Sequence, residues 1–399
     1  MSVDTIVIIG GGVIGLSTAY QLALKRVGRV VLLDKGLLGD GASSRAAGIG
    51  SQLQWSETGV HARQIGFQLF RQFSDEWDDY TFHDEHGCLN LFTPDGWSAR
   101  ATLLPLYDRL GAPYRVLDPQ EIRDRWPALN PADGISALHD LQGGYSEPDE
   151  YLRALTKRVR DLGVEIREGE PTIGFLRRGE RVVGVRTVRQ SVDAEAVVST
   201  VHVWSLPVWK ELGLQLPMKH FVHQRYLSKP LPQPFVAPPV NADPYLGYIR
   251  PAHGNRVLMG IETSDREEYR VGSLDFRMEA LSTPTTVRDQ GQERMLDFAP
   301  ILRDVAWDAE HVGLISFTSD GEPILGAVGN LPGLFVAASF HSGGFSYNAV
   351  AGLLMAELVV AGRTSIDISA FSPDRFAAVE TERHLEMTLR QSQAIRRRH

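Results

Sequence analysis

Residues 4–35 read DTIVIIGGGVIGLSTAYQLALKRVGRVVLLDK, and this stretch decides the fold. Ile6–Ile9 is an apolar run of the length expected for a buried parallel strand. Gly10, Gly12 and Gly15 follow with the spacing G-x-G-x-x-G, which permits a tight turn, close backbone approach and close packing of helix on strand. The next residues, Leu16–Lys25, are predicted to form a helix that begins beside this turn.

A second apolar run, Val30–Leu33, ends at Asp34 and Lys35. The acid thus lies roughly 20 residues after the glycines, where it accepts hydrogen bonds from a ribose hydroxyl in dinucleotide-binding folds. The N-terminal amides of this helix would face a pyrophosphate. Strand, glycines, helix and acid together predict a dinucleotide site; the alternative is a glycine-rich turn in another α/β domain.

Composition indicates a globular enzyme rather than a nucleic-acid-binding protein. A chain of 399 residues is long for one core, so we expect two domains. The net charge of −8 argues against phosphate backbones as partners. The single cysteine, Cys88, excludes an internal disulfide, and no signal sequence is recognisable, so we expect a cytoplasmic protein. The apolar segment Ala349–Ala361 is short and contains Glu357, so no membrane span is expected.

A loop of small residues, GDGASSRAAGIG, covers residues 39–50. Such residues let the backbone approach a ligand, and Ser43, Ser44 and Arg45 offer donors to phosphate. The alternative is a flexible surface loop.

Hydrophobic periodicity predicts the remaining elements. The aromatic residues of His61–Tyr80 recur at helical spacing and indicate a core helix. Pro105–Pro131 is proline-rich and predicted to be an irregular crossing between domains. Further expected elements are a helix around residues 152–162 and strands at 88–92, 164–166, 172–176, 181–188, 196–199, 219–227, 245–250, 256–260 and 334–338.

Histidines do not predict a metal site. His220 and His223 lie on opposite faces of the expected strand 219–227, because side chains alternate along a strand. They and His202 are therefore interpreted as structural residues.

Glycines return near the C-terminus, where FHSGGFS (residues 340–346) leads into an apolar helix. A glycine pair at a helix N-terminus is typical of a place where backbone amides approach negative charge.

Four motifs resemble the D-amino-acid oxidase / glycine oxidase / sarcosine oxidase superfamily of FAD-dependent oxidoreductases, and most of all its sarcosine oxidase β-subunit-like branch. They are GGGVIGLSTAYQLA, GASSRAAG, the block GVEI…RVVGV…AEAVVST, and TSDGEPILG…GGFSYNAVAGLLMAELV. The resemblance implies an α/β protein (α+β overall) with a Rossmann-type FAD domain and a substrate domain with a mixed sheet. It places the FAD domain at residues 1–81, 143–216 and 309–399, and the substrate domain at 82–142 and 217–308.

The implied reaction is oxidation of the C–N bond of a secondary amine or amino acid (N-methyl, cyclic or D-amino acid) to an imine, with oxygen or another acceptor reoxidising the flavin. Two alternatives remain open: an FAD-dependent 2-hydroxyacid or polyol dehydrogenase of the same fold, and a flavoprotein subunit active only within a larger complex. The expected partner is a small molecule, and the oligomeric state is left open.

The resemblance also implies which residues bind FAD: Gly10, Gly12, Val13, Ile14, Gly15, Asp34, Lys35, Ser43, Ser44, Arg45, Ala47, Gly48, Ile49, Thr200, Trp204, Ser342, Gly343, Gly344, Phe345 and Ser346. The two covalent-attachment positions of relatives hold Ile315 and Arg45 here, so non-covalent FAD is expected.

The carboxylate anchors of monomeric sarcosine oxidases are missing, since their positions fall near Gly50–Ser51 and at Ser346. Tyr248 and Arg250 resemble the carboxylate clasp of glycine and D-amino-acid oxidases, and an arginine fork suits a carboxylate. We therefore predict Arg250, assisted by Tyr248, as the substrate anchor, with an ordinary surface pair as the alternative. His341, beside the C-terminal glycines, is a third candidate for a catalytic role, against the simpler interpretation as a structural loop residue.

Overall fold

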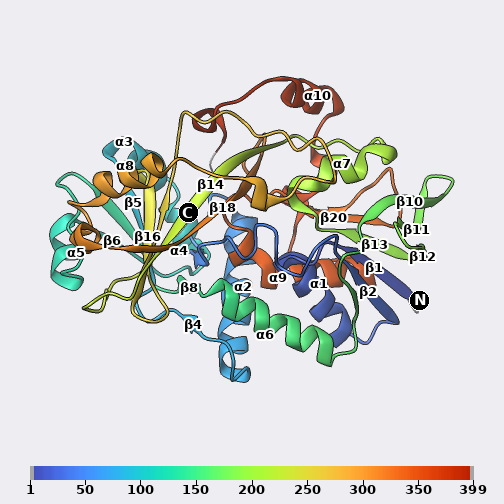
Figure 1. Ribbon diagram of the computed structural model, residues 1–399, viewed down its shortest axis with the longest axis horizontal. Helices are drawn as coiled ribbons and strands as arrows, with labels where there is room; N and C mark the ends of the chain where they lie inside the picture. The colour runs from blue at the N-terminus through green and yellow to red at the C-terminus, as the bar shows by residue number, and fades with distance from the viewer. Residues whose placement is uncertain (1–3, 396–399) are drawn as a thin grey trace.

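The computed structural model describes residues 4–395 and is built around two large sheets (Figure 1). The first has six strands in the order β19-β20-β13-β1-β2-β9. All neighbours are parallel except the pair β19–β20. The strands are β1 (Thr5–Ile9), β2 (Arg29–Leu33), β9 (Glu165–Arg167), β13 (Ala196–Ser199), β19 (Ile324–Ala327) and β20 (Leu334–Ala338).

Both faces of this sheet are buried, which explains why β1 and β2 are continuously apolar. Ile6 and Ile8 pack into one core with the helices, whereas Val7 and Ile9 pack into another on the opposite face. The helices are α1 (Val13–Leu24), α2 (Glu57–Glu76), α6 (Pro148–Asp161) and α9 (Gly344–Ala361). The opposite face is covered by α7 (Ser205–Trp209) and a small sheet of β10 (Thr172–Arg178), β11 (Arg181–Thr187) and β12 (Ser191–Asp193).

The second large sheet has eight strands in the order β18-β14-β17-β16-β15-β5-β7-β6. It is mixed, because β15 and β5 are parallel while the other neighbours are antiparallel. Its strands are β5 (Cys88–Phe92), β6 (Tyr114–Leu117), β7 (Ser136–Asp140), β14 (Met218–Ser228), β15 (Val240–Ala242), β16 (Gly247–Ala252), β17 (Arg256–Ile261) and β18 (Trp307–Thr318). Figure 1 shows β14 and β18 running from this sheet towards the first.

Smaller elements complete the fold. A three-stranded sheet joins β3 (Ile49–Gly50), β8 (Gly144–Ser146) and β4 (Phe82–His83). The remaining α-helices are α3 (Pro94–Ala101), α4 (Leu104–Arg109), α5 (Pro119–Arg125), α8 (Thr285–Met295) and α10 (Ala378–Glu386).

The prediction of an irregular crossing at residues 105–131 was wrong. This segment contains most of α4, then β6 and α5. Pro105 and Pro119 stand in the first turns of α4 and α5, where a missing N–H costs nothing. Asp118 and Glu121 form a capping box at the start of α5. The helix expected at 61–80 is α2, which begins at Glu57; Trp77 and Tyr80 follow its end but are buried, as expected for core aromatics.

The strands of the first sheet all come from the segments assigned to the FAD domain by resemblance. The second sheet draws on the substrate-domain segments, but β18 lies across the predicted boundary at 308/309 and extends that sheet to Thr318.

α9 is long and apolar enough to cross a membrane by length and composition, but 61% of this stretch is buried inside the protein. It packs closely on α1: a Cβ at Gly352 would lie 2.5 Å from the backbone carbon of Ser17. A mostly buried helix of this kind is also what the core of a globular protein contains.

Candidate functional site

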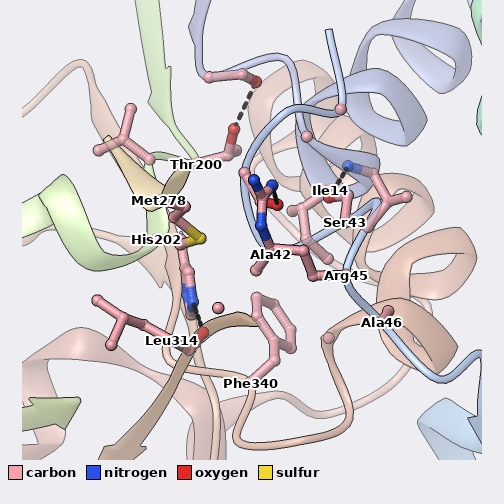
Figure 2. A pocket seen from close by; sticks show the side chains of 18 of the residues that line it. Ile14, Ala42, Ser43, Arg45, Ala46, Thr200, His202, Met278, Leu314 and Phe340 are labelled. Carbon is pink, nitrogen blue, oxygen red and sulfur yellow. Dashed lines mark hydrogen bonds between the residues drawn. The ribbon is translucent and has the colours of Figure 1, made fainter. Parts of the chain in front are cut away.

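A long cleft lies between the glycine turn after β1 and the second sheet. Its empty volume, open mouth included, is about 1950 Å³. Figure 2 shows Ile14, Ser43 and Arg45 on one side of it and Thr200, His202 and Leu314 on the other. The sequence-predicted residues that line it are Gly10, Gly12, Val13, Ile14, Asp34, Lys35, Ser43, Arg45, Ala47, Gly48, Ile49, Thr200, Trp204, Tyr248, His341, Ser342, Gly344 and Phe345.

The turn between β1 and α1 is shaped by its glycines. Gly10 has φ +103°, a left-handed conformation, and a Cβ there would lie 2.9 Å from the carbonyl oxygen of Thr200. A Cβ at Gly15 would lie 1.9 Å from the Gly10 carbonyl oxygen, so Gly15 allows close packing rather than lining the cleft. The Gly12 N-cap has no capping side chain, and Val13 N–H donates to Ser43 Oγ at 3.0 Å. Ser43 thus satisfies the Val13 amide, and the positive end of the helix, at Gly12, Val13 and Ile14, lines the cleft, where it favours a negatively charged group.

Asp34 is held at the end of β2 by its own turn. Its Oδ2 accepts from Gly11 N–H at 2.6 Å and its Oδ1 from Gly36 N–H at 2.7 Å. Burial raises the pKa of Asp34, against the opposing effect of these two hydrogen bonds. This fixed acid is placed where a ribose would lie next to the glycine turn.

A segment of the substrate-domain side crosses this half of the cleft. Residues 273–280, here called the strap, include cleft-lining Leu274, Arg277, Met278 and Glu279. Lys35 Nζ donates to the carbonyl oxygens of Leu274 (2.8 Å) and Phe276 (2.5 Å). Trp204 Nε1 also donates to Phe276 O, at 3.0 Å. Lys35 and Trp204 therefore hold the strap.

Arg45 and Arg225 hold the loop of residues 39–48. Arg45 Nη1 donates to the carbonyl of Gly41 at 2.8 Å, and its Nη2 forms an ion pair with Glu279 at 2.9 Å. Arg225, on β14, donates to the carbonyls of Ser44 (2.9 Å) and Arg45 (3.1 Å). The Arg45 side chain lines the cleft while engaged with these protein groups, and its role as a phosphate donor stays a prediction.

The predicted carboxylate anchor, Arg250, is engaged elsewhere. Its side chain is fully buried, and Nη1 and Nη2 bind the two carboxylate oxygens of Glu147 at 2.8 and 2.9 Å. Its Nε donates to Ala47 O at 2.6 Å, and its guanidinium lies 4.5 Å from the ring centroid of Tyr145. The fork does meet a carboxylate, but one supplied by the protein, and Arg250 does not line the cleft. The structure therefore gives Arg250 a partner within the protein, Glu147, away from the cleft lining.

Tyr248 does line the cleft, in a polar cluster with His223 and Asn241. Tyr248 OH lies 3.1 Å from His223 Nε2, and the two rings are stacked with centroids 5.6 Å apart. The Tyr248 ring lies across β17 at Gly260, where an added Cβ would be 1.8 Å from it. Sequence reasoning treated His223 as structural and did not consider Asn241. The alternation of side chains in the strands expected at 219–227 and 245–250 could have indicated which residues share a face. Only the order of the strands in the sheet shows that these three residues lie together.

His341 has φ +56° and pairs with Ser316 in an isolated β-bridge. Its Nε2 lies 3.3 Å from Thr318 Oγ1. It lines the cleft beside Ser342, Gly344 and Phe345, at the start of α9.

Four predicted FAD residues lie outside the lining. They are Gly15, Ser44, Gly343 and Ser346. The hydroxyl of Ser346 donates to Ile49 O at 3.1 Å and so fastens α9 to β3.

His202 and His220, both interpreted from the sequence as structural, differ in whether they line the cleft. His202 lines the cleft, with Nε2 2.9 Å from Leu314 O, and burial lowers its pKa. His220 is buried away from the cleft against Ser316 Oγ at 3.0 Å, and burial lowers its pKa to about 3. Within residues 4–395, no three His, Cys, Asp or Glu side chains gather as a metal site would require.

Comparison with known proteins agrees with this geometry. The family model described as FAD dependent oxidoreductase (DAO) matches residues 5–358. The chain therefore belongs to this family of FAD-dependent oxidoreductases.

Sequence identity to individual relatives is below 30% in the comparisons that follow. The chain is 28% identical to glycine oxidase of Geobacillus kaustophilus over 93% of this chain and 96% of that protein. It is 26% identical to sarcosine oxidase subunit beta of Arthrobacter sp, over 93% and 90%. Mouse (Mus musculus) sarcosine dehydrogenase is also 26% identical, but the chain spans only 42% of its length. The crystal structure of L-proline dehydrogenase from P. horikoshii superposes with a TM-score of 0.84 at 23% identity, covering 94% of this chain and 98% of that one.

The residues present fit FAD. The open α1 N-terminus suits a pyrophosphate, Asp34 suits a ribose, and the cleft continues past the strap to the start of α9. Bound there, FAD would accept a hydride from a substrate, and the protein would supply orientation and electrostatics.

Proposed function

We propose that this chain oxidises the C–N bond of a secondary amine or amino acid to an imine, using non-covalently bound FAD that oxygen or another acceptor reoxidises. The observation that carries the proposal is the polar cluster of His223, Tyr248 and Asn241. It lies in the same cleft as the glycine turn and the start of α9.

The cluster has the means to orient a small polar substrate. The hydrogen bond and ring stacking between His223 and Tyr248 restrain both side chains. The lining of the cleft also includes apolar residues, among them Leu314, Ile315 and Phe345. A few fixed polar groups in an apolar pocket are typical of small-molecule sites. Oxidation of an amine in this way needs no protein nucleophile, because hydride leaves once the nitrogen is neutral and the resulting imine reacts with water.

Relatives support an amine substrate through their names. These include sarcosine dehydrogenase, 4-methylaminobutanoate oxidase and glycine oxidase. Because the chain spans less than half of the first two, it is also consistent with a flavoprotein subunit that works within a larger assembly. A cytoplasmic location stays part of the proposal.

Anaerobic bleaching of the flavin absorbance tests the reaction. Sarcosine, glycine, L-proline, D-alanine and 4-methylaminobutanoate would be compared with the 2-hydroxy acids glycolate and lactate. We expect at least one amine, and neither hydroxy acid, to bleach the flavin. Bleaching by hydroxy acids alone would favour the dehydrogenase alternative, and no bleaching by any compound would favour the subunit alternative. Hydrogen peroxide release in air then distinguishes oxidase from dehydrogenase.

The attachment of FAD is tested separately. Ile315, at the covalent position of some relatives, lines the cleft without a nucleophilic atom. Cys88 is buried and absent from the lining, and burial raises the pKa of its thiol well above the usual value. We expect acid precipitation to leave all the flavin in the supernatant; flavin in the protein pellet would contradict non-covalent binding.

A further inference from the structure

Asn241 belongs to a row of side chains that crosses the second sheet. In register, Arg225 pairs with Gly260, Gly260 with Tyr248, Tyr248 with Asn241, and Asn241 with Asn90. Directly opposed residues in neighbouring strands point to the same face. This face carries the polar cluster of the cleft. Asn241 therefore lies at the edge of the cleft beside Tyr248, and its other neighbour in the row, Asn90, lies inside the protein.

The donor direction along this row is fixed from its buried end. Asn90 Nδ2 lies 3.4 Å from both the carbonyl of Leu138 and Ser51 Oγ. A backbone carbonyl only accepts, so Leu138 requires the amide nitrogen of Asn90 on this side. Ser51 agrees, because its hydroxyl donates to Asp140 Oδ2 at 3.0 Å and is left as an acceptor for Asn90.

Asp140 anchors this end. Besides Ser51, it accepts from Gln52 N–H (2.6 Å), Gln52 Nε2 (3.0 Å) and Gln142 N–H (3.0 Å). All four groups are donors to one fully buried carboxyl group. In this network of hydrogen bonds, every group that contacts Asp140 is therefore a donor and Asp140 is the acceptor.

It follows that Asn90 presents its oxygen to Asn241. Asn241 Nδ2 donates to Asn90 Oδ1 at 2.8 Å and contacts Cys88 Sγ at 3.8 Å. The amide nitrogen of Asn241 is thus committed to the protein interior. Its carbonyl oxygen, Oδ1, receives no donor from any residue between 4 and 395, and Asn241 lines the cleft beside Tyr248. A rotation of the amide would place two acceptor oxygens against each other, so the orientation is enforced.

We propose that Asn241 Oδ1 accepts a hydrogen bond from the substrate nitrogen and so selects amines that keep an N–H when neutral, that is, primary or secondary amines over tertiary ones. The inference rests on the proposed function and adds the substrate class. A site built to bind an N–H rejects the analogue that lacks it, because the acceptor is then desolvated without a partner. Asn241 is in this sense a specificity-determining residue.

The test compares matched pairs of substrates that differ only by an N-methyl group: sarcosine with N,N-dimethylglycine, and L-proline with N-methyl-L-proline. Reduction of the flavin is followed anaerobically for wild-type protein, Asn241→Leu, Asn241→Asp and the surface control Asn130→Leu. Leucine is close to asparagine in size but has no polar atom. Aspartate, when its carboxyl group is protonated, can donate its O–H to Asn90 Oδ1 and keep its carbonyl oxygen as an acceptor for the substrate. FAD content and melting temperature are recorded for each variant.

We expect the wild-type protein and Asn130→Leu to reduce the N–H partner of a pair about tenfold faster, at low concentration, than its N-methyl partner. Asn241→Leu should lose most of this preference through slower reaction of the N–H partner, and Asn241→Asp should retain it. A leucine variant with the wild-type preference overturns the inference. So does a folded aspartate variant that behaves like leucine even at a pH where its carboxyl group is protonated. If Asn241→Leu does not fold, the aspartate variant decides. If no amine, in these pairs or in the larger panel, reduces the flavin of the wild-type protein, the proposed function is overturned, and this inference with it.

Discussion

At the scale of single residues, the pair of Arg250 and Glu147 shows why residue type and neighbourhood alone do not identify a substrate anchor. An arginine next to a tyrosine on a strand suits a carboxylate ligand. In the fold, the same geometry is satisfied by Glu147 at the N-cap of α6. Burial opposes ionisation of Glu147, but the charge and hydrogen bonds of Arg250 and the N–H of His253 outweigh it and hold its pKa below the ordinary value.

Replacing Arg250 with methionine should therefore weaken the fold. The variant leaves Glu147 buried without a cation, and we expect the free energy of unfolding to fall by about 3–5 kcal/mol. A carboxylate with a lowered folded pKa stabilises the protein above its unfolded pKa, near 4.3, and loses that contribution as pH falls through the folded pKa. The difference between wild type and variant should thus shrink below about pH 4. Urea denaturation across pH measures both effects.

The double variant Arg250→Met/Glu147→Gln is the control, since it removes both charges and should recover part of the loss. Unchanged stability together with a raised KM for amino acids but not for simple amines would return Arg250 to the role of a substrate anchor.

At the scale of elements, the turn from β1 to α1 contains glycines that the fold requires and one glycine at which the fold leaves more room for a side chain. Gly10 and Gly15 have backbone atoms within 3 Å of an added Cβ. At Gly12 the single neighbour within 4 Å is Ser43 Oγ, at 3.0 Å, and φ is −75°. The protein itself thus restricts a side chain at Gly12 much less than at Gly10 or Gly15.

Gly12→Val is expected to fold but to lose FAD, because its side chain occupies the approach of the pyrophosphate to the α1 amides. We expect affinity for FAD to fall by at least about 100-fold, equivalent to about 2.7 kcal/mol, with the far-UV circular dichroism unchanged. Gly272→Val is the matched control, since a Cβ there meets nothing within 4 Å. Normal FAD content in Gly12→Val would show that the pyrophosphate lies elsewhere.

At the scale of the whole molecule, the strap connects the two sheet systems across the cleft. It follows β17 of the second sheet in the chain, and Lys35 and Trp204, which follow β2 and β13 of the first sheet, hold it. Burial, with the charge of Arg277, lowers the pKa of Lys35 to about 8. A lysine with a lowered folded pKa disfavours folding while protonated, so its contribution to stability rises with pH between about 8 and its ordinary value near 10.4.

Lys35→Met should loosen the strap without removing the FAD site. The variant loses two hydrogen bonds from a charged donor to strap carbonyls, and we expect FAD to be released about tenfold faster or more. The rise in flavin fluorescence after dilution measures the release rate. Lys25→Met, on the exposed end of α1, serves as the control and should release FAD at the wild-type rate. Equal rates in all three proteins would mean that the strap does not retain the cofactor.

The sequence by itself determined the family, the FAD-binding turn and most strands and helices, because these depend on local patterns: the glycine spacing, the acid at Asp34 and the apolar runs of β1 and β2. It failed at residues 105–131, where proline was interpreted as a breaker although it starts α4 and α5. The tertiary structure alone decided the arrangement of the cleft around the polar cluster. Glu147 and Arg250, 103 residues apart, neutralise each other, while β14, β15 and β16 bring His223, Asn241 and Tyr248 together. Pairing between distant strands leaves no periodic signal in the chain, so side-chain partners there become visible only once the sheet order is known.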